Sequence, residues 1–305
     1  MYTKHVYKMR PTLIKDSYTI VCPSKSRIPW KLRQHLRTKL IGKRIYFFKE
    51  IGSTQDLAVS LAEKDMKDLD GTVIISERQK NGRGRIGKRW ISPKGGIWLS
   101  VILKPKIAAA FSPVLSCVAA IAVCDTVNEK TKLCSNIKWP NDIVIRGRKV
   151  SGVLVDVSTE AENVNYAVIG IGINANVNNS RIISQVCDIK GLEFFGITSL
   201  KSELGEIEVN IPEIILLVLQ KLEYYYMQLN RGYYKEIIGK WKDNSETLDN
   251  LVVIKRQNEI FEGIAVDVDI DGGLLVKSAD GNIHRVISSP DVIVRKKFSQ
   301  DEIYR

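Results

Sequence analysis

The sequence predicts an α+β fold, in which one large domain mixes strands and helices and a small β-barrel follows it. Short apolar runs typical of strands, such as residues 72–76 and 97–103, alternate with longer helical patterns. Beyond residue 248 the pattern shortens to brief strands separated by turn residues. The 305 residues, with 44% hydrophobic content, are enough to bury a full core in one large domain with small attachments.

Composition excludes several classes of protein. The chain has no secretory signal and no run of about eighteen apolar residues that would span a membrane. Its five cysteines are odd in number and include no C-x-x-C pair, which argues against a disulfide framework and a zinc site. The formal charge of +12 is spread along the chain, which indicates an ordinary solvated surface. We therefore expect a soluble, cytoplasmic protein.

The first part of the chain, residues 1–42, is basic and contains three prolines. A helical pattern is visible only at residues 30–38. A winged-helix DNA-binding domain needs about 60 residues with three periodic helices, and this segment offers neither. We predict an arm that lies on the main domain.

The next elements follow in order. Residues 44–48 form a predicted strand, and a helix begins after Ser53, which with Asp56 has the spacing of a capping box. Strands at 72–76 and 97–103 follow. Ser112, as N-cap, and Pro113 then begin a long buried helix.

The later elements continue the alternation. A β-hairpin is predicted from residue 137 to Asp156, with its turn at Gly147. The strand at 166–174 carries Gly170 and Gly172 at period two, which clears one face for a flat ligand or another backbone. Two amphipathic helices are predicted at 211–229 and 233–241. The final brief strands cover residues 251–255, 260–266, 273–277 and 283–287, with an EF-hand-like acidic turn at 267–272 that we interpret as a hairpin.

The stretch from Glu77 to Ser100, here called the glycine-rich loop, connects two predicted strands. Its glycines match G-x-G-x-x-G, the pattern of a dinucleotide-binding loop. However, the residues after Trp90 contain Pro93 and paired glycines and then a strand, so no helix N-terminus follows to receive a pyrophosphate. We favour a mobile loop that closes over phosphate or carboxylate groups. Its cations are Arg83, Arg85, Lys88 and Arg89.

The residues that carry chemistry are cations and glycines, without a convincing nucleophile. No Ser/His/Asp set and no activated cysteine is apparent. Cations gather in the glycine-rich loop and between Lys138 and Gly152, beside the acidic Asp142. This set suits a reaction that brings two anions together, such as a carboxylate and the α-phosphate of ATP, to form an acyl-adenylate. Asp142 would then bind Mg²⁺.

Four ordered segments resemble the biotin protein ligases. They are G-R-G-R-x-G-x-x-W, K-W-P-N-D, R-K-V-S-G-V-L-V-D and G-I-G-I-N. The resemblance extends from about residue 43 to the C-terminus. It implies a class II synthetase-like, biotin–lipoate ligase fold with a mixed β-sheet and packed helices, followed by an SH3-like domain. The expected division is an arm at 1–42, a catalytic domain at 43–246 and the SH3-like domain at 247–305.

The resemblance also implies a reaction and roles for residues. Biotin and ATP form biotinyl-5′-AMP, and a lysine of a biotin-acceptor protein then attacks this intermediate. The expected catalytic residues are Lys149, Arg83 and Arg85. Biotin is expected to contact Ser53, Thr54, Gln79, Arg83, Lys149 and Gly152. The nucleotide is expected to contact Arg85, Trp90, Lys138 and Asn174, and Mg²⁺ is expected at Asp142.

Partners and alternatives follow from the same resemblance. The acceptor is expected to be a biotin-dependent carboxylase subunit, and a homodimer is expected. Longer family members bind DNA as repressors, whereas no operator binding is expected here. A lipoate or octanoate ligase or transferase is the main alternative, although its ligand lacks the ureido ring that Ser53, Thr54 and Gln79 would bind. A nucleic-acid-binding module that uses the +12 charge is the alternative from another class.

Overall fold

A mixed β-sheet forms the centre of the protein in the computed structural model. The structure describes residues 14–15, 18–21, 32, 34–64, 68–85, 87–178, 196–256, 259–288 and 292–296. Within this part of the chain the sheet has nine strands. Their order is β1 (Ile14–Lys15), β2 (Tyr18–Val21), β3 (Arg44–Phe48), β4 (Thr72–Ser76), β5 (Ile97–Leu103), β9 (Asn163–Ile173), β8 (Arg148–Glu160), β7 (Asp142–Ile145) and β6 (Ser135–Lys138). The pairs β2–β3 and β3–β4 are parallel, and the others are antiparallel.

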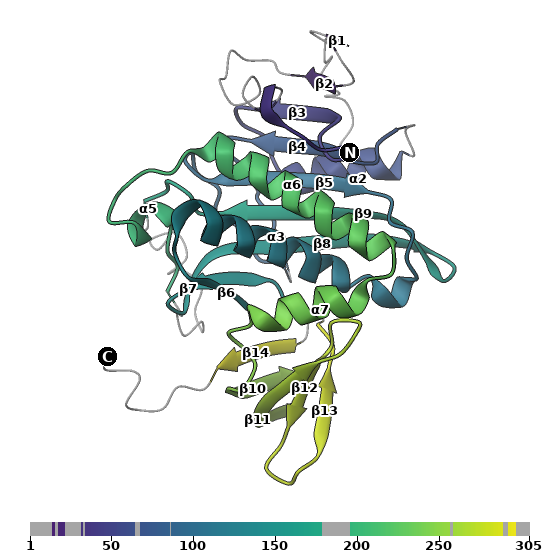
Figure 1. Cartoon of the computed structure of the whole chain (residues 1–305), viewed down its shortest axis with the longest axis vertical. Helices are drawn as coiled ribbons and strands as arrows, with labels where there is room; N and C mark the ends of the chain where they lie inside the picture. The colour runs from purple at the N-terminus through teal and green to yellow at the C-terminus, as the bar shows by residue number, and fades with distance from the viewer. Residues whose placement is uncertain are drawn as a thin grey trace.

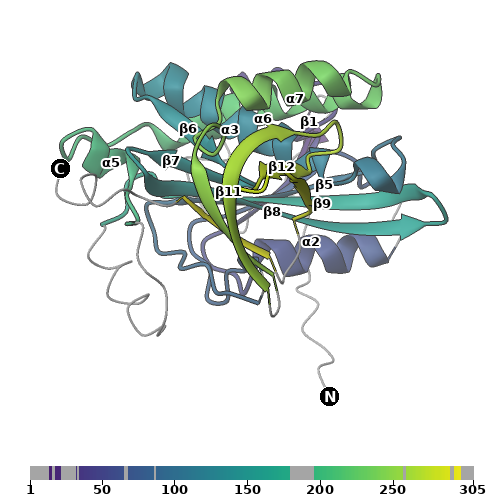
Figure 2. The same ribbon diagram turned by 90° about the horizontal axis from the view of Figure 1, so that it is seen from below.

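Helices cover the two faces of this sheet unequally. Helices α3 (Val114–Thr131), α6 (Ile211–Asn230) and α7 (Tyr234–Asp243) lie on one face, and α2 (Thr54–Glu63) lies on the other (Figures 1 and 2). The large core fills the space under α3 and α6, whereas a smaller apolar cluster lies under α2. The α2 face is therefore the less covered one, and the predicted site residues lie there.

Helix α3 is apolar around most of its surface up to Val127 because that part of the helix is almost entirely buried. The stretch Ala109–Thr131 is long and apolar enough to cross a membrane by length and composition, yet α3 lies on the sheet with α6 on one side and α7 on the other, as a core helix does (Figure 1). The start of α3 differs from the sequence prediction. Ser112 ends a short 3₁₀ helix (Ala109–Phe111) with helical backbone angles, so it makes no side-chain cap for α3.

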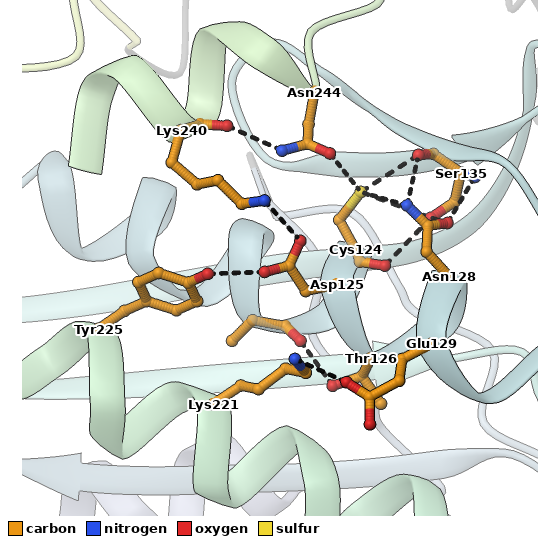
Figure 3. Close-up of polar contacts among 11 residues, drawn as sticks. Cys124, Asp125, Thr126, Asn128, Glu129, Ser135, Lys221, Tyr225, Lys240 and Asn244 are labelled. Atoms are coloured by element: carbon orange, nitrogen blue, oxygen red, sulfur yellow. Dashed lines mark hydrogen bonds and ion pairs between the residues drawn. The ribbon is translucent and has the colours of Figure 1, made fainter. Parts of the chain in front are cut away.

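Polar side chains join α3 to α6 and α7 at one end of the core (Figure 3). Asp125 on α3 accepts a 2.6 Å hydrogen bond from the Tyr225 hydroxyl and lies 3.3 Å from Lys240 Nζ. At the preceding position of α3, the Cys124 thiol donates to the Ser135 carbonyl oxygen at 3.2 Å. These contacts satisfy polar groups that the packing of three helices would otherwise leave without partners.

A five-stranded antiparallel sheet follows the main domain, as the sequence predicts, and is consistent with an SH3-like domain. Its order is β13 (Ile283–Val286), β12 (Leu274–Lys277), β11 (Glu259–Val268), β10 (Leu251–Arg256) and β14 (Val292–Lys296). Strand β14 was not in the sequence prediction. The acidic turn binds Arg285 through Asp269 and Asp271, as expected of a hairpin rather than a calcium loop. Trp139 Nε1 donates to the Gly272 carbonyl at 3.1 Å and so connects the two sheets.

The described parts of residues 1–42 belong to the main sheet and core. Strand β2 pairs with β3, and Leu32 and Leu36 are buried in the large core. On α6, the buried carboxylate of Glu223 accepts hydrogen bonds of 2.6–2.7 Å from the backbone amides of residues 39–41. This segment therefore contributes to folding; the boundary at residue 42 stays a prediction.

Candidate active site

Strand register places predicted site residues from different motifs in one row across the sheet. Directly opposed residues of antiparallel strands have side chains on the same face. The row consists of Lys138, Asp142, Gly152, Gly172, Trp98 and Ser76. The neighbouring row consists of Leu154, Gly170, Ser100 and Ile74. Ile74 belongs to the apolar cluster under α2, so both rows lie on the α2 face.

A β-bulge brings Lys149 to this face. Side chains alternate along a strand, so Lys149 and Gly152, three positions apart, would normally face opposite sides of the sheet. The register of β7 with β8 shifts between Ile143 and Val144, which inserts one extra residue in β8. Val150 consequently points into the large core, while the Lys149 ammonium lies near Trp90 on the α2 face. The bulge therefore adds a cation to the row of predicted site residues.

Three glycines, Gly152, Gly170 and Gly172, form a surface without side chains, here called the glycine surface. Trp90 of the glycine-rich loop covers part of it: a Cβ atom on Gly172 would lie 2.7 Å from Trp90 Nε1, and one on Gly152 would lie 3.0 Å from Trp90 Cζ3. A Cβ on Gly170 would lie 2.5 Å from Gln55 Oε1. As the sequence predicts, the glycines leave one face of the strand open to close approach, and the side chains of Trp90 and Gln55 pack against that face.

Lys149 lies between an acid and an aromatic ring. Its Nζ atom is 2.6 Å from Asp142 Oδ1 and 5.0 Å from the centroid of the Trp90 ring. Both charged side chains are about one-third exposed, at 31% and 27%. A cation beside a ring face and a carboxylate is well placed to meet an anion that enters above the glycine surface.

A polar network surrounds the start of α2. Ser53 caps the helix, and its Oγ accepts from the Asp56 amide at 3.2 Å, as the capping box predicts. Gln79 Oε1 accepts hydrogen bonds from the Thr54 amide at 2.8 Å and the Thr54 hydroxyl at 3.0 Å. The Thr54 hydroxyl also lies 2.9 Å from Ser100 Oγ. Ser53, Thr54 and Gln79 thus form a cluster of donors and acceptors beside the glycine surface.

Gln55 extends this network, although the sequence analysis left it out of the site. It is 3% exposed. Its Oε1 accepts from Ser100 Oγ at 2.9 Å, and its Nε2 donates to Asp156 Oδ2 and the Val168 carbonyl at 3.0 Å each. Gln55 therefore connects the polar cluster at the start of α2 to a carboxylate of β8.

Arg83 is paired with two carboxylates. Its NH1 lies 3.2 Å from Asp56 Oδ1 and 3.0 Å from Asp156 Oδ2, and all three side chains are partly exposed. Exposed pairs of this kind contribute at most about 1 kcal/mol. Arg83 can therefore exchange these partners for the carboxylate or phosphate of a substrate at low cost.

Arg85 connects the glycine-rich loop to two other parts of the chain. Its guanidinium donates to Asn141 Oδ1 at 3.0 Å and to Ser288 Oγ at 2.7 Å. Burial lowers the pKa of the guanidinium, and nearby Asp142 opposes that change. Arginine remains charged at any physiological pH. The loop is thus fastened to the main sheet and to the C-terminal sheet through one cation.

Asn174 and Lys138 lie at the margins of the sheet face that carries the other predicted site residues. Asn174 is 3% exposed, and its Nδ2 donates to the Thr198 carbonyl at 3.0 Å. Lys138 is half-buried on β6 and opposes Asp142 across the strand pair. The structure therefore brings all the predicted site residues to one face and its margins.

Among the predicted site residues, Asp142 is the one carboxylate that could bind a magnesium ion. The described residues contain no group of three or more histidine, cysteine or acidic side chains that could bind a metal. Mg²⁺ commonly uses one or two carboxylates together with water and substrate phosphates. Asp142 fits that pattern, because it lies in the row of site residues and remains partly exposed beside Lys149.

Four residues that the sequence did not predict for the site form hydrogen bonds to the site residues or to Gln55; they are Ser100, Asn141, Asp156 and Ser288. Asn141 lies in the K-W-P-N-D segment, and Asp156 ends the R-K-V-S-G-V-L-V-D segment. Ser100 is the one hydroxyl in the otherwise apolar strand at residues 97–103, and that exception could have marked it as a site residue. Ser288 comes from the C-terminal sheet region, 203 positions from Arg85, and no pattern in the sequence indicates that contact.

Comparisons with known proteins agree with this arrangement. Residues 48–174 match the Biotin/lipoate A/B protein ligase family, and residues 250–295 match the Biotin protein ligase C terminal domain. The chain is 31% identical over 252 residues to the bifunctional ligase/repressor BirA of Bacillus subtilis, covering 82% of this chain and 74% of the relative. It is 28% identical to the biotin–[acetyl-CoA-carboxylase] ligase of Mycobacterium tuberculosis, covering 85% and 93%.

A solved structure supports the same assignment. The biotin protein ligase from Aquifex aeolicus, in complex with biotin and ATP, superposes with a TM-score of 0.66 at 27% identity, covering 83% of this chain and 99% of that one. Sequence similarity over most of both chains, the mixed sheet and the C-terminal sheet all lead to one conclusion: this chain belongs to the biotin protein ligase family.

Proposed function

We propose that this protein is an ATP-dependent ligase that activates biotin as biotinyl-5′-AMP and transfers it to a lysine of a biotin-acceptor protein. One observation carries the proposal. Thr54 is hydrogen-bonded to Gln79 and Ser100, and these polar side chains lie beside the glycine surface. Trp90 covers part of that surface, and Lys149 lies at its margin. Such a face offers hydrogen bonds to a ureido ring and positive charge for a carboxylate and a phosphate, and its glycines give a flat ligand room when Trp90 moves off them.

In the first step, a biotin carboxylate oxygen attacks the α-phosphorus of ATP, and pyrophosphate leaves. Both reactants are anions, so catalysis requires neutralisation and alignment. Lys149 and Arg83 lie at the margins of the glycine surface and are the cations that would meet the carboxylate and the α-phosphate. Mg²⁺ bound at Asp142 would neutralise phosphate oxygens, with Lys138 opposite it.

In the second step, the amine of the acceptor lysine attacks the carbonyl carbon of biotinyl-5′-AMP, and AMP leaves. The nucleophile belongs to the acceptor. Among the described residues, the buried thiols Cys117 and Cys124 lie outside the site, and burial raises the pKa of each. The enzyme's part is to retain the intermediate, with Trp90 over it, Arg85 fastening the loop and Asn174 at the nucleotide end.

Lipoate is the competing acid. It lacks a ureido ring, so the donors and acceptors at Ser53, Thr54 and Gln79 would lose partners on binding it, which costs about 1–3 kcal/mol for each buried polar group left unpaired. Incubation with ATP, Mg²⁺ and each acid separates the two. Release of pyrophosphate with lipoate and not with biotin would overturn the choice of biotin.

The acceptor is proposed to be a carboxylase subunit, in the cytoplasm, with a homodimer as the working assembly. Mass spectrometry of a purified biotin-acceptor fragment, after incubation with the enzyme, ATP and biotin, tests the proposal directly. One added biotinyl group on one lysine is expected, and an unmodified fragment would contradict it. Submicromolar DNA binding at physiological salt would instead support the nucleic-acid-binding alternative.

A further inference from the structure

Glu203 is a buried carboxylate that none of the roles above includes. It is the last residue of α5 (Leu200–Glu203), and its side chain is 0% exposed. Its Oε1 accepts from the Thr198 hydroxyl at 2.5 Å and lies 2.6 Å from Arg148 NH2. Its Oε2 lies 3.7 Å from Arg146 NH1. Glu203 therefore joins α5 both to the segment that precedes it and to the beginning of β8.

The segment at residues 196–198 contacts two residues of the proposed site. The Lys149 amide donates to the Gly196 carbonyl at 2.9 Å, and the Thr198 amide donates to the Lys149 carbonyl at 2.9 Å. The Asn174 side-chain amide donates to the Thr198 carbonyl at 3.0 Å. One three-residue segment thus fixes the backbone of Lys149 and the side chain of Asn174.

The opposite side of the same segment contacts Glu203. Thr198 binds Lys149 and Asn174 through its backbone and Glu203 through its hydroxyl. Arg148, the other partner of Glu203, immediately precedes Lys149 at the bulge in β8. The carboxylate consequently restrains Lys149 from two directions, through the residue before it and through the segment beside it.

Stability alone is a weak reason for this arrangement. Removing a carboxylate from water costs several kcal/mol, and ion pairs of this kind are often no more stabilising than apolar residues of similar size. A charged hydrogen-bonded network does, however, restrict geometry more than an apolar contact does. A network located directly behind two site residues is therefore better explained by the positions it gives them.

We propose that Glu203 is a positioning residue, which orients Lys149 and Asn174 toward the ATP side of the site through Thr198 and Arg148. This inference rests on the proposed function and deepens it. Because Ser53, Thr54 and Gln79 lie on and near α2, away from α5, the proposal separates the two substrates. Lys149 is proposed to meet both substrates, whereas Asn174 is proposed to contact the nucleotide alone, and biotin keeps its hydrogen bonds to the start of α2. Loss of Glu203 should therefore impair the use of ATP much more than the binding of biotin.

The experiment compares Glu203→Gln with Glu223→Gln. The first change keeps an acceptor for the Thr198 hydroxyl and removes the charge that faces Arg148. The second removes the charge of another buried glutamate, which binds backbone amides of residues 39–41 on the opposite face of the sheet. Both variants should lower Tm, so Tm alone decides nothing. The deciding measurements are KM for ATP, kcat for biotinyl-5′-AMP formation, and Kd for biotin.

For Glu203→Gln we expect kcat/KM for ATP to fall by about ten- to a hundredfold, because a small displacement of a group that aligns the reactants has an effect of that size. The Kd for biotin should stay within about twofold of wild type. Glu223→Gln should leave all three constants near wild type. Unchanged kcat/KM for ATP in Glu203→Gln, or an equal loss in biotin affinity, would overturn the proposal.

Hydrogen exchange gives a readout that does not need catalysis. Without any ligand, the amides of Lys149 and Thr198 should exchange faster in Glu203→Gln than in wild type, while Glu223→Gln leaves them unchanged. Equal exchange in all three proteins would also overturn the proposal. If the wild-type protein forms no biotinyl-5′-AMP, the proposed function fails instead, whatever the exchange shows.

The partly exposed Arg148 allows a second test, of whether its ion pair with Glu203 acts as a unit. In the double variant Arg148→Met with Glu203→Gln, both members of the ion pair are neutral, so no buried charge remains without a partner. If the pair acts as a unit, the double variant loses no more kcat/KM for ATP than Glu203→Gln alone. Losses that multiply would show that Glu203 does not act through Arg148.

Discussion

Arg85 NH2 donates a 2.7 Å hydrogen bond to Ser288 Oγ, and this bond joins the glycine-rich loop to the C-terminal sheet region. The same guanidinium binds Asn141 of the main sheet at 3.0 Å. We therefore expect closure of the loop over the proposed adenylate to depend on both parts of the protein. A region of the chain that is remote in sequence thereby contacts the glycine-rich loop.

Ser288→Ala should weaken retention of biotinyl-5′-AMP. A hydrogen bond to a charged group contributes about 1.5–3 kcal/mol, and water replaces part of that here, so we expect dissociation to quicken by about five- to tenfold. Arg85→Gly, which removes both bonds, should release the adenylate faster still. The check is the rate at which labelled adenylate leaves the purified enzyme.

Ser278, a half-buried residue whose hydroxyl is hydrogen-bonded to the Asn282 carbonyl and to His284 in the same sheet region, supplies the control. Ser278→Ala should leave the dissociation rate unchanged. If Ser288→Ala and Ser278→Ala retain the adenylate equally well, the C-terminal sheet has no part in closing the loop.

Lys149→Met should depress adenylate formation by about a hundred- to a thousandfold, the usual cost of losing a group that stabilises developing charge. Pyrophosphate release at saturating ATP and biotin measures it. Lys221→Met is the matched control, since Lys221 pairs with Glu129 between α6 and α3 on the other face. Turnover of Lys149→Met within about twofold of the control would contradict the role given to Lys149.

Gly172→Ala should displace Trp90. The added Cβ would lie 2.7 Å from Trp90 Nε1, closer than real contacts allow, and the backbone of β9 cannot move away from it. We expect KM for ATP to rise by about tenfold and Trp90 to become more exposed, visible as a red-shifted tryptophan emission. Gly239→Ala on α7, where a Cβ meets no atom within 4 Å, should change neither quantity. Identical behaviour of the two variants would rule out close packing on the glycine surface.

The Cys124 thiol should make stability depend on alkaline pH. Burial raises its pKa from 9.0 to about 11, so the folded state favours the protonated thiol. That contribution to the free energy of unfolding is complete below about pH 9, the pKa of the thiol in the unfolded chain, and is lost as pH rises through about 11. The maximum loss is roughly 3 kcal/mol for a change of about two units.

Cys124→Ser isolates this contribution, because its hydroxyl does not titrate in the range. Urea unfolding of both proteins between pH 7 and pH 10.5 should show the wild type losing stability relative to the variant as pH rises. Parallel curves across the range would mean that Cys124 does not titrate with folding.

Local patterns determined much of the architecture. Short apolar runs located strands β3, β4, β5 and β9, and amphipathic periods located α6 and α7, because these elements bury one continuous run or stripe. Strand β2 was missed. It lies between β1 and β3 near one edge of the sheet. Pairing with a strand that is distant in sequence produces no clear pattern of apolar and polar residues within so short a segment.

The sequence by itself also determined which chemical groups the site contains: the glycine-rich loop with its arginines, the helix start at Ser53, and the paired glycines of β9. The tertiary structure alone decided how they meet. Lys149 shares a face with Gly152 only because of the bulge in β8, and Gly152 lies opposite Gly172 only because of strand register. Both depend on packing and hydrogen bonds between strands, which the order of residues within one segment does not express.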